Sequence, residues 1–565
     1  MTDAFSIFRN RKRKKVIQVK EIKFRPGILG ALALTLASAM MTSSAMACTV
    51  YGIGKDATAD GSTMVTHTCD STSDDFRMWI IPEMEGGEGI TADIVMNGNT
   101  WGDWSDYPNT KNYGSGMVMG EMPQPKDTFQ YLHTNYSIIN ENGVAMGEST
   151  CGIDSTTEYG KKMNALMNEG NNGIIDCYQA QHVALRYATT AREAVEIMGA
   201  LVDEYGWNAW PECINICDGN EVWIAEFYGR DLWCAVRVPD DAFFVCANRC
   251  RINEIDFEDN ENYIWSKTLK PFAIENGLWS EDSGVPFQPA NIYAPNYSMG
   301  CIRREWRALS LVAPSLNLDP HVDPQNAVYP MFVVPENKLS VEDVRKMNSD
   351  YYQGTEFDVS LSPEAGPYGN PLNEYNKERP INMYRATYHF IANIKADMPK
   401  EAKPLMWIGW GAPDSSYMVP LFATMTKLPP QLSTGSRYGK FDRDSAWWVS
   451  SYVQQTATQN YDSAIEEIYA ARDPKMAEQY ETVIAMQEAA AALSNAGKGD
   501  EAVKLLTDYA YNNAIDWHNY WLELGDELYG TYMFNRVDMK RAAYPDWWSE
   551  ILNNAPRRPV EESAK

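Results

Sequence analysis

The chain carries a cysteine, Cys48, at the position where an N-terminal export signal would end. It directly follows Ala45-Met46-Ala47, a small–any–small pattern that is typical of signal-peptidase cleavage. Cleavage after Ala47 would leave Cys48 as the first residue, with a free α-amine beside its own thiol. One residue would then hold both a nucleophile and a base, a combination that predicts an enzyme.

The segment before Cys48 has the order of a secretory signal. Residues 1–47 contain nine Lys or Arg against two acidic residues, and an apolar run follows from 28 to 41. That run is shorter than the about 20 residues that span a bilayer, and charged or polar residues interrupt every later apolar run. We therefore expect removal of residues 1–47 by signal peptidase. The mature protein is expected to be exported (secreted, cell-surface or periplasmic), with no transmembrane segment.

The charge of the chain narrows the class of partners. The net charge is −27, and removal of a segment of net charge +7 brings the mature chain near −34. So acidic a surface argues against binding to nucleic acid or to anionic membranes. The remaining ~518 residues are too many for one compact core, so one large or two coupled domains are expected. Whether the protein forms a homo-oligomer is left open.

Ten cysteines occur in the chain, and nine remain to pair if Cys48 stays free. At least one other must then be unpaired, and the rest are expected as disulfides or buried thiols. The spacings Cys213-x-x-x-Cys217 and Cys246-x-x-x-Cys250 resemble zinc pairs but lack turn-forming spacers. The run from Cys213 to Cys217 instead reads as a strand with both thiols on one face. No metal and no cofactor is expected.

The order of the expected elements indicates an α+β fold. Strands come first, with hairpins at Asp60-Gly61 and Asn142-Gly143. Thr190-Ala-Arg-Glu193 forms a capping box for a helix over 191–204. Strands return over 213–248, a loop-rich region begins at about 255, and helices are expected over 475–495 and 500–513. Such an order is typical of a layered α+β fold with a helical C-terminal section.

Several catalytic motifs are absent. With six histidines, the chain has neither a His-Glu-x-x-His zinc motif nor a Gly-x-Ser-x-Gly elbow. A thiol hydrolase with a Cys–His pair remains an alternative class of enzyme, although the residues around each histidine single out none of them. An N-terminal cysteine needs none, because its α-amine has a pKa of about 7.7–8.0 and can take the thiol proton.

The residues around Cys48 carry a family resemblance. Cys48-Thr49 and the run from Gly54 to Ser62 closely resemble the opening of the N-terminal-nucleophile (Ntn) cysteine dipeptidases. This PepD-type family is related to secernins and more distantly to bile-salt hydrolases and penicillin V acylases. The resemblance spans most of the mature chain, and its N-terminal block is the most specific. It continues through 140–151, 217–223, 237–249, 407–420 and 445–448.

The resemblance implies an Ntn-hydrolase αββα four-layer sandwich, in which two stacked sheets place the N-terminal strand at their edge. The expected domains are a signal peptide over 1–47, a catalytic domain over 48–440 with loop-rich insertions from about 255, and a helical section over 441–565. The implied activity is hydrolysis of dipeptides or short peptides through a thioester acyl-enzyme.

The resemblance also assigns roles to four residues. Cys48 would be the nucleophile, Asp70 would hydrogen-bond its amine or thiol, Asn248 would belong to the oxyanion hole, and Arg304 would lie near the nucleophile. The chemistry agrees, because a neutral amide donor stabilises an oxyanion and a guanidinium favours thiolate. Arg304 is preferred to Arg303 by its spacing to Arg307.

Two positions depart from the family pattern. Relatives commonly carry Arg three residues before the aspartate, where this chain has His67. Either His67 or Arg77 is then a candidate for binding a substrate carboxylate. Thr150 stands where bile-salt hydrolases place an oxyanion asparagine, so its backbone N–H would have to substitute. Both differences favour peptides over bile acids.

Two other functions compete with this prediction. Cys48 could be lipidated, which would make the protein a non-catalytic, lipid-anchored surface binding protein. Ala45 stands where lipidated cysteines usually have Leu, and strand-like sequence rather than a Gly/Ser tether follows Cys48. The second rival is an N-acyl amide hydrolase of the same fold.

Overall fold

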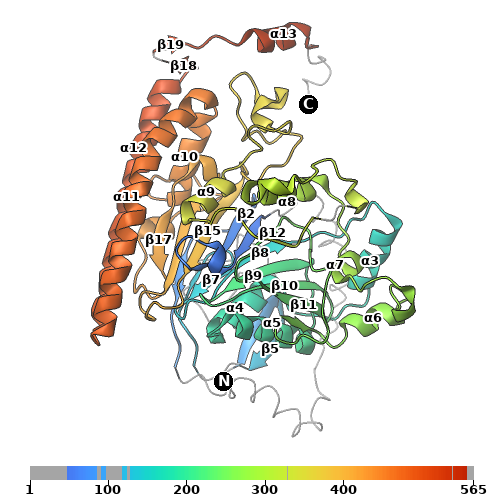
Figure 1. The fold of residues 1–565 in the computed structure, drawn as a ribbon. Helices are drawn as coiled ribbons and strands as arrows, with labels where there is room; N and C mark the ends of the chain where they lie inside the picture. The colour runs from blue at the N-terminus through green and yellow to red at the C-terminus, as the bar shows by residue number, and fades with distance from the viewer. Residues whose placement is uncertain are drawn as a thin grey trace.

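The computed structural model describes residues 48–85, 91–96, 117–123, 127–326, 329–537 and 539–556. Two large antiparallel sheets lie at the centre of the molecule, and long helices follow toward the C-terminus (Figure 1). The predicted signal peptide, residues 1–47, lies outside the described residues.

The first large sheet has seven strands and contains the strand that follows Cys48. This strand, β1, lies between β12 and β2, so both of its edges are hydrogen-bonded. All of its residues are buried. The spatial order is β14 (Phe332–Val333), β12 (Phe243–Cys246), β1 (Val50–Ile53), β2 (Thr63–Asp70), β15 (Ala386–Ile394), β16 (Pro404–Trp410) and β17 (Val419–Phe422).

The second large sheet has eight strands, and its middle is formed by β9 and its neighbours. Their near-continuous apolar sequences reflect burial on both faces. The spatial order is β13 (Tyr263–Trp265), β11 (Leu232–Val238), β10 (Val222–Gly229), β9 (Glu212–Cys217), β8 (Ala145–Thr150), β7 (Ser137–Asn140), β6 (Tyr131–His133) and β3 (Trp79–Ile81).

The two sheets pack face to face near β1 and β2. From β9, Asn215 donates through Nδ2 to the carbonyl oxygens of Tyr51, at 2.5 Å, and Thr66, at 3.1 Å. Gly147 on β8 allows the same close approach, because a Cβ there would lie 2.3 Å from the Thr66 carbonyl oxygen. The amide holds β9 against the first sheet, and the missing side chain lets β8, which carries Glu148, approach β2, which carries His67.

Helices lie against both sheets. α4 contacts β7, and α5 contacts β9, β10 and β11 of the eight-stranded sheet. On the seven-stranded sheet, α8 contacts β12 and α9 contacts β15. The bounds are α3 (Glu158–Asn168), α4 (Cys177–Tyr187), α5 (Ala191–Tyr205), α6 (Leu269–Glu275), α7 (Pro289–Tyr293), α8 (Met299–Val312) and α9 (Val341–Asn348).

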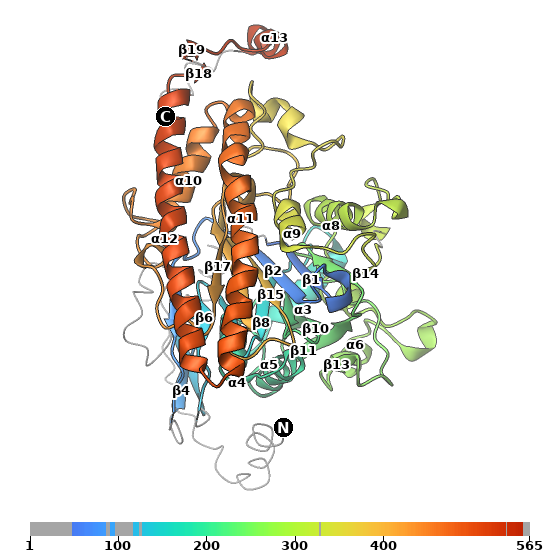
Figure 2. The same ribbon diagram turned by 60° about the vertical axis from the view of Figure 1, so that its left-hand side comes forward.

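The C-terminal part is helical. Two long helices, α11 and α12, run antiparallel along one side of the molecule, with α10 beside them (Figure 2). α12 contacts β17 and α10 contacts β16, so this layer covers the end of the seven-stranded sheet. The bounds are α10 (Ala446–Ala457), α11 (Tyr461–Asn495), α12 (Gly499–Tyr532) and α13 (Asp546–Asn554). Two small sheets complete the fold, β4 (Thr91–Met96) with β5 (Met117–Pro123), and β18 (Arg536–Val537) with β19 (Lys540–Arg541).

The structure confirms an α+β chain with antiparallel sheets and a helical C-terminal part. The turn predicted at Asn142-Gly143 joins β7 to β8, and Gly143 has a φ of +83°, which glycine adopts without strain. Thr190 caps α5 by accepting a hydrogen bond from the Glu193 amide. The Glu193 carboxylate reaches back to Thr189, so the reciprocal half of the predicted capping box falls one residue earlier.

The region after 255 is more regular than its composition predicts. It contains α8, and its strands β15 and β16 are central members of the seven-stranded sheet. Pro, Asn and Tyr mark the connections in this region, whereas the apolar run Ala386–Ile394 carries the strand signal. The predicted domain boundary at 440 stays a prediction.

None of the helices in the described ranges combines the length and the apolar character that crossing a membrane requires.

Candidate active site

Cys48 lies two residues before the first residue of β1 and is almost completely buried, with 2% of its surface exposed. An isolated bridge pairs Thr49 with Thr68 of β2, so the strand register brings Cys48 alongside Cys69 and Asp70. Its thiol donates to the Glu148 carboxylate, with 3.5 Å between Sγ and Oε1. Burial, followed by the Glu148 charge, raises the pKa of the Cys48 thiol well above its usual value. The thiol is therefore protonated here and needs a base to become a nucleophile.

The backbone of Cys48 is held by two side chains. Arg304 of α8, which is fully buried, donates from Nη1 to the Cys48 carbonyl oxygen at 2.9 Å. The hydroxyl of Ser149 donates to the same oxygen at 3.3 Å. Arg304 also reaches the Thr49 hydroxyl at 2.9 Å and the Ala247 carbonyl oxygen at 3.1 Å. A single guanidinium thus ties the start of β1 to the turn after β12.

Asn248 follows β12 with a φ of +63°, a left-handed conformation that asparagine tolerates better than most residues. Its Nδ2 donates to the Thr150 carbonyl oxygen at 2.7 Å and approaches the Ser149 hydroxyl at 3.3 Å. Its Oδ1 accepts from Arg304 Nη2 at 2.9 Å. These bonds orient the amide, with its nitrogen toward the end of β8.

Asp70 ends β2 and forms an ion pair with Arg379, with 3.2 Å between Oδ2 and Nη2. Burial raises the pKa of Asp70 to about 6, although Arg379 and Arg304 oppose the shift. Arg379 Nη1 also lies 3.4 Å from Asn248 Oδ1. The side chain of Arg379 is 20% exposed while that of Asp70 is 1% exposed, so Arg379 forms the outer part of the site.

His67 and Thr150 meet at Glu148. The Nε2 atom of His67 lies 3.2 Å from Glu148 Oε1, and the Thr150 hydroxyl donates to Oε2 at 3.3 Å. Burial alone would raise the pKa of Glu148, but the neighbouring His67 holds it below its usual value. The ring of His67 is enclosed by the edges of Tyr136, Tyr388 and Phe390.

The structure joins six of the seven predicted site residues in one network and places the seventh elsewhere. Arg77 forms a bidentate ion pair with Asp75 and lies 5.4 Å above the ring of Trp79. The joined residues are Cys48, His67, Asp70, Thr150, Asn248 and Arg304. Their roles in catalysis remain predictions.

Sequence reasoning missed Glu148, Ser149 and Arg379. A signal for Glu148 was present, because a carboxylate inside the buried run Ala145–Thr150 has to be paired. Arg379 had no such signal, since it lies outside every strand and helix and approaches Asp70 only through the fold.

All ten cysteines are buried free thiols. Cys213 and Cys217 lie on β9, in agreement with the strand predicted over 213–217. The Sγ atoms of Cys151 and Cys246 lie 3.9 Å apart.

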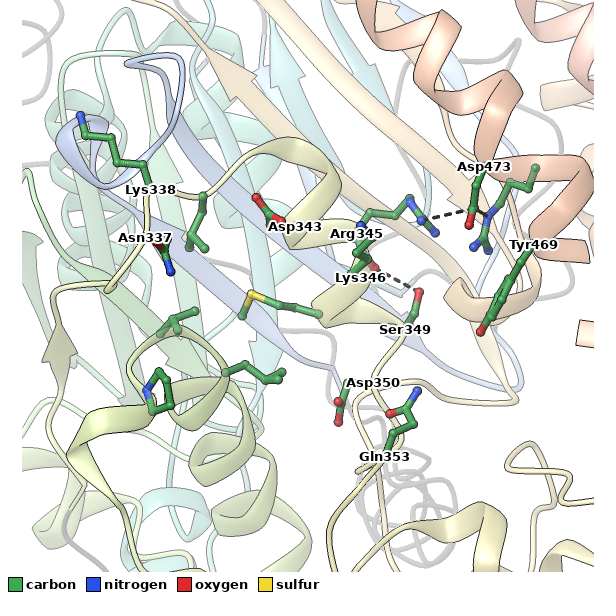
Figure 3. Close-up of a pocket in the computed structure, with 16 residues that line it drawn as sticks. Asn337, Lys338, Asp343, Arg345, Lys346, Ser349, Asp350, Gln353, Tyr469 and Asp473 are labelled. Atoms are coloured by element: carbon green, nitrogen blue, oxygen red, sulfur yellow. Dashed lines mark hydrogen bonds and ion pairs between the residues drawn. The ribbon is translucent and has the colours of Figure 1, made fainter. Parts of the chain in front are cut away.

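A cavity of about 540 Å³ lies among α8, α9 and α11, and Cys48 is not part of its lining (Figure 3). Arg345 lies in its wall, paired with Glu342 at 2.7 Å and with Asp473 at 3.7 Å. The Ser349 hydroxyl donates to the Arg345 carbonyl oxygen (Figure 3). The lining contains neither cysteine nor histidine, so the chemistry of Cys48 is not located there.

The family described as peptidase family C69 matches residues 47–473, which is more than half of the chain. The match begins one residue before Cys48 and includes every residue of the network. Together with the buried thiol site, it defines the protein as a cysteine-type peptidase. The chain belongs to peptidase family C69.

Three curated relatives illustrate the similarity. The chain is 25% identical over 433 residues to "Probable dipeptidase B" of Lactococcus lactis subsp. lactis, covering 74% of this chain and 83% of the relative. It is 28% identical over 410 residues to "Probable dipeptidase" of Latilactobacillus sakei, covering 69% and 79%. It is 26% identical over 432 residues to "Dipeptidase A" of Lactobacillus helveticus, covering 73% and 82%. These matches confirm the family resemblance of the sequence.

Proposed function

We propose that the protein is an exported cysteine dipeptidase whose nucleophile is created by cleavage of the Ala47–Cys48 bond. The observation that carries this proposal is the position of Cys48, at the start of a central strand with its carbonyl oxygen held by Arg304 and Ser149. A thiol at the start of the mature chain would combine this fixed geometry with a free amine. The dipeptidase names of the relatives support the substrate class.

The proposed fold is the four-layer Ntn-hydrolase sandwich. Two antiparallel sheets packed face to face, with α4 and α5 on one and α9 to α12 on the other, support this assignment. β1 between β2 and β12 would present the N-terminal residue at the end of the sheet interface.

The proposed reaction begins with proton transfer from the Cys48 thiol to its own α-amine, directly or through water. The thiolate sulfur attacks the carbonyl carbon of the peptide bond, and the carbonyl electrons move onto oxygen. The ammonium then returns the proton to the departing amine, and the C–N bond breaks to leave a thioester. Water, deprotonated by the same amine, hydrolyses the thioester and restores the thiol. The raised pKa of the buried thiol makes such a base necessary.

Asn248 is the proposed side-chain donor to the oxyanion. Its Nδ2 has two hydrogens, and the Thr150 carbonyl oxygen accepts one of them at 2.7 Å. The second hydrogen faces the Ser149 hydroxyl, beside the Cys48 carbonyl group. Arg304 holds Oδ1 and so fixes the plane of the amide, and the second hydrogen would turn from its 3.3 Å contact with Ser149 to the oxyanion.

Arg379 is the proposed receptor for the free carboxylate of the substrate. It is the partly exposed cation beside Asp70 and Asn248, at 3.2 Å and 3.4 Å. Of the two candidates from the sequence, His67 is fully buried next to Glu148, and Arg77 is paired with Asp75. A guanidinium beside the proposed catalytic residues can bind a substrate carboxylate through two parallel hydrogen bonds.

The experiment compares hydrolysis of dipeptides by wild type and Cys48→Ala, with the N-terminal sequence and intact mass of the exported proteins. We expect a chain that starts at Cys48 without lipid, and loss of hydrolysis in Cys48→Ala. The matched control is Cys217→Ala, which removes another buried thiol, on β9, and should keep the wild-type activity. Full activity of Cys48→Ala, or diacylglycerol on Cys48, would overturn the proposal, and cleavage of N-acyl amino acids alone would overturn the substrate class.

A further inference from the structure

We propose that Cys48, His67 and Glu148 form a zinc-binding site that inhibits the enzyme when it is filled. The Cys48 Sγ, a His67 ring nitrogen and a Glu148 carboxylate oxygen all lie within 4.8 Å of one another. Thiolate, imidazole and carboxylate are the three ligand types that zinc takes in proteins. The three residues come from the start of β1, from β2 and from β8, so the packing of the two sheets assembles the site.

The distances between the donor atoms fit a tetrahedral cation. With zinc bonds of about 2.3 Å to sulfur and about 2.0 Å to nitrogen and oxygen, tetrahedral angles put sulfur and oxygen about 3.5 Å apart and nitrogen and oxygen about 3.3 Å apart. The corresponding distances are 3.5 Å from Cys48 Sγ to Glu148 Oε1 and 3.2 Å from His67 Nε2 to the same oxygen. Two of the three distances therefore match the corners of a zinc tetrahedron, and the third, between Cys48 Sγ and a His67 ring nitrogen, is within 4.8 Å.

His67 gives a second, independent indication. Its ring is fully buried, and neither ring nitrogen makes a hydrogen bond to any part of the chain that the structure describes. Nε2 is close to Glu148 Oε1, but the geometry is not that of a hydrogen bond. Two metal-ligand atoms that bind the same cation come close to each other without a hydrogen bond between them, because the lone pair of each points at the metal.

The surroundings of Glu148 suit the same cation. The Thr150 hydroxyl binds Oε2 at 3.3 Å, which leaves Oε1 directed at Cys48 and His67. Hydrogen bonds of this kind orient metal ligands. A divalent cation would balance the thiolate and the carboxylate, whereas two unpaired anions at this depth would be strongly unfavourable.

Binding would exchange a proton for the metal. The Cys48 thiol proton leaves to solvent and a Zn–S bond takes its place, so the sulfur lone pair is no longer free to attack a substrate. In a chain that starts at Cys48, the α-amine can fill the fourth position from the same residue. The inhibition rests on the proposed function, but the binding requires only the three side chains.

The test is a titration with Co²⁺, which gives a thiolate-to-metal absorption band, in the full-length chain and in the chain that starts at Cys48. Zn²⁺ should abolish the band by displacement. We expect Glu148→Gln and His67→Ala each to weaken binding by more than about tenfold. The matched control is His321→Ala, because His321 also contacts a glutamate, Glu356 at 2.7 Å, but on the surface. Its band should equal that of the wild type.

Anomalous scattering at the zinc edge from crystals of the wild-type protein also tests the site. This measurement needs no substitution, so a misfolded variant cannot confuse the result. A peak among Cys48 Sγ, His67 Nε2 and Glu148 Oε1 supports the inference, and its absence at saturating Zn²⁺ overturns it. An unchanged band in both ligand variants also overturns it. If the absorption band forms but the metal-free enzyme cleaves no dipeptide, the metal site stands and the proposed dipeptidase function is overturned. If the metal-free enzyme cleaves dipeptides and Zn²⁺ does not reduce its activity, the dipeptidase function stands and the inhibitory site is overturned.

Discussion

Arg304 Nη1 donates a 2.9 Å hydrogen bond to the carbonyl oxygen of Cys48, although the two residues are 256 positions apart in the chain. The guanidinium is fully buried on α8, and its other nitrogens bind the Gly300 and Ala247 carbonyl oxygens. The position of the nucleophile therefore depends on a helix that lies far from it in sequence.

Arg304→Gln should lower the free energy of unfolding by at least about 2 kcal/mol, because it removes hydrogen bonds from a charged donor, each worth about 1.5–3 kcal/mol, to the buried carbonyl oxygens of Cys48 and Ala247. Urea denaturation measures this loss. Arg303→Gln is the matched control, since Arg303 pairs with Glu378 and leaves Cys48 untouched; its loss should be about 1 kcal/mol. Equal losses in the two variants would contradict the assigned contact.

Arg379→Gln should lower kcat/KM for dipeptides by about 10- to 100-fold, which is the range of a lost hydrogen bond to a charged group. The same variant should cleave the corresponding dipeptide amides at nearly the wild-type rate, because those substrates lack the carboxylate. Steady-state kinetics with both substrate series decide the matter. An equal loss with acids and amides would mean that Arg379 serves only to hold Asp70.

Asn248→Gly should lower kcat by about 10²–10³ while the protein stays folded. Glycine adopts the φ of +63° without strain, so the change removes the amide donor and leaves the turn in place. Thermal unfolding monitors the fold and single-turnover kinetics the chemical step. An active Asn248→Gly variant would exclude Asn248 from the oxyanion hole.

Glu226 should make the stability depend on pH. This carboxyl is fully buried on β10, accepts hydrogen bonds from the Ile252 amide and the Tyr228 hydroxyl, and has its pKa raised by burial to about 8. The folded state then binds this proton more tightly than the unfolded state. The contribution is present in full below about pH 4.5 and is lost as the pH rises through 8.

The loss should be on the order of 4 kcal/mol between pH 5 and 9, because one pKa unit corresponds to about 1.4 kcal/mol. Glu226→Gln keeps an acceptor oxygen and removes the titration. Urea denaturation of both proteins across this range should show the wild type falling relative to the variant. Parallel curves would contradict the assignment.

The sequence predicts the local parts of the site better than the distant ones. A hairpin over 54–62 brings β2 back beside β1, and this register places Asp70 near Cys48 as expected. The sequence favours Arg304 over Arg303 by its spacing to Arg307, and in the structure it is Arg304 that contacts Cys48. Such relations follow from the periods of strands and helices, which a sequence shows directly.

The remaining parts depend on how the two sheets pack. Glu148 meets His67 only because β8 crosses β2, and the glycine at 147 is what permits that approach. Arg379 reaches Asp70 from a segment without regular structure, 309 residues further along the chain. Neither contact follows from the periodicity of a strand or a helix, so neither could be predicted from one sequence.

The central claim is that a free α-amine on Cys48 is the base for its own thiol. The most direct measurement compares kcat/KM for a dipeptide between a chain that starts at Cys48 and the same chain with Ala47 retained as an uncleaved first residue. The single extra residue should abolish hydrolysis, because an amide nitrogen cannot accept the thiol proton. Equal activity of the two chains would contradict it.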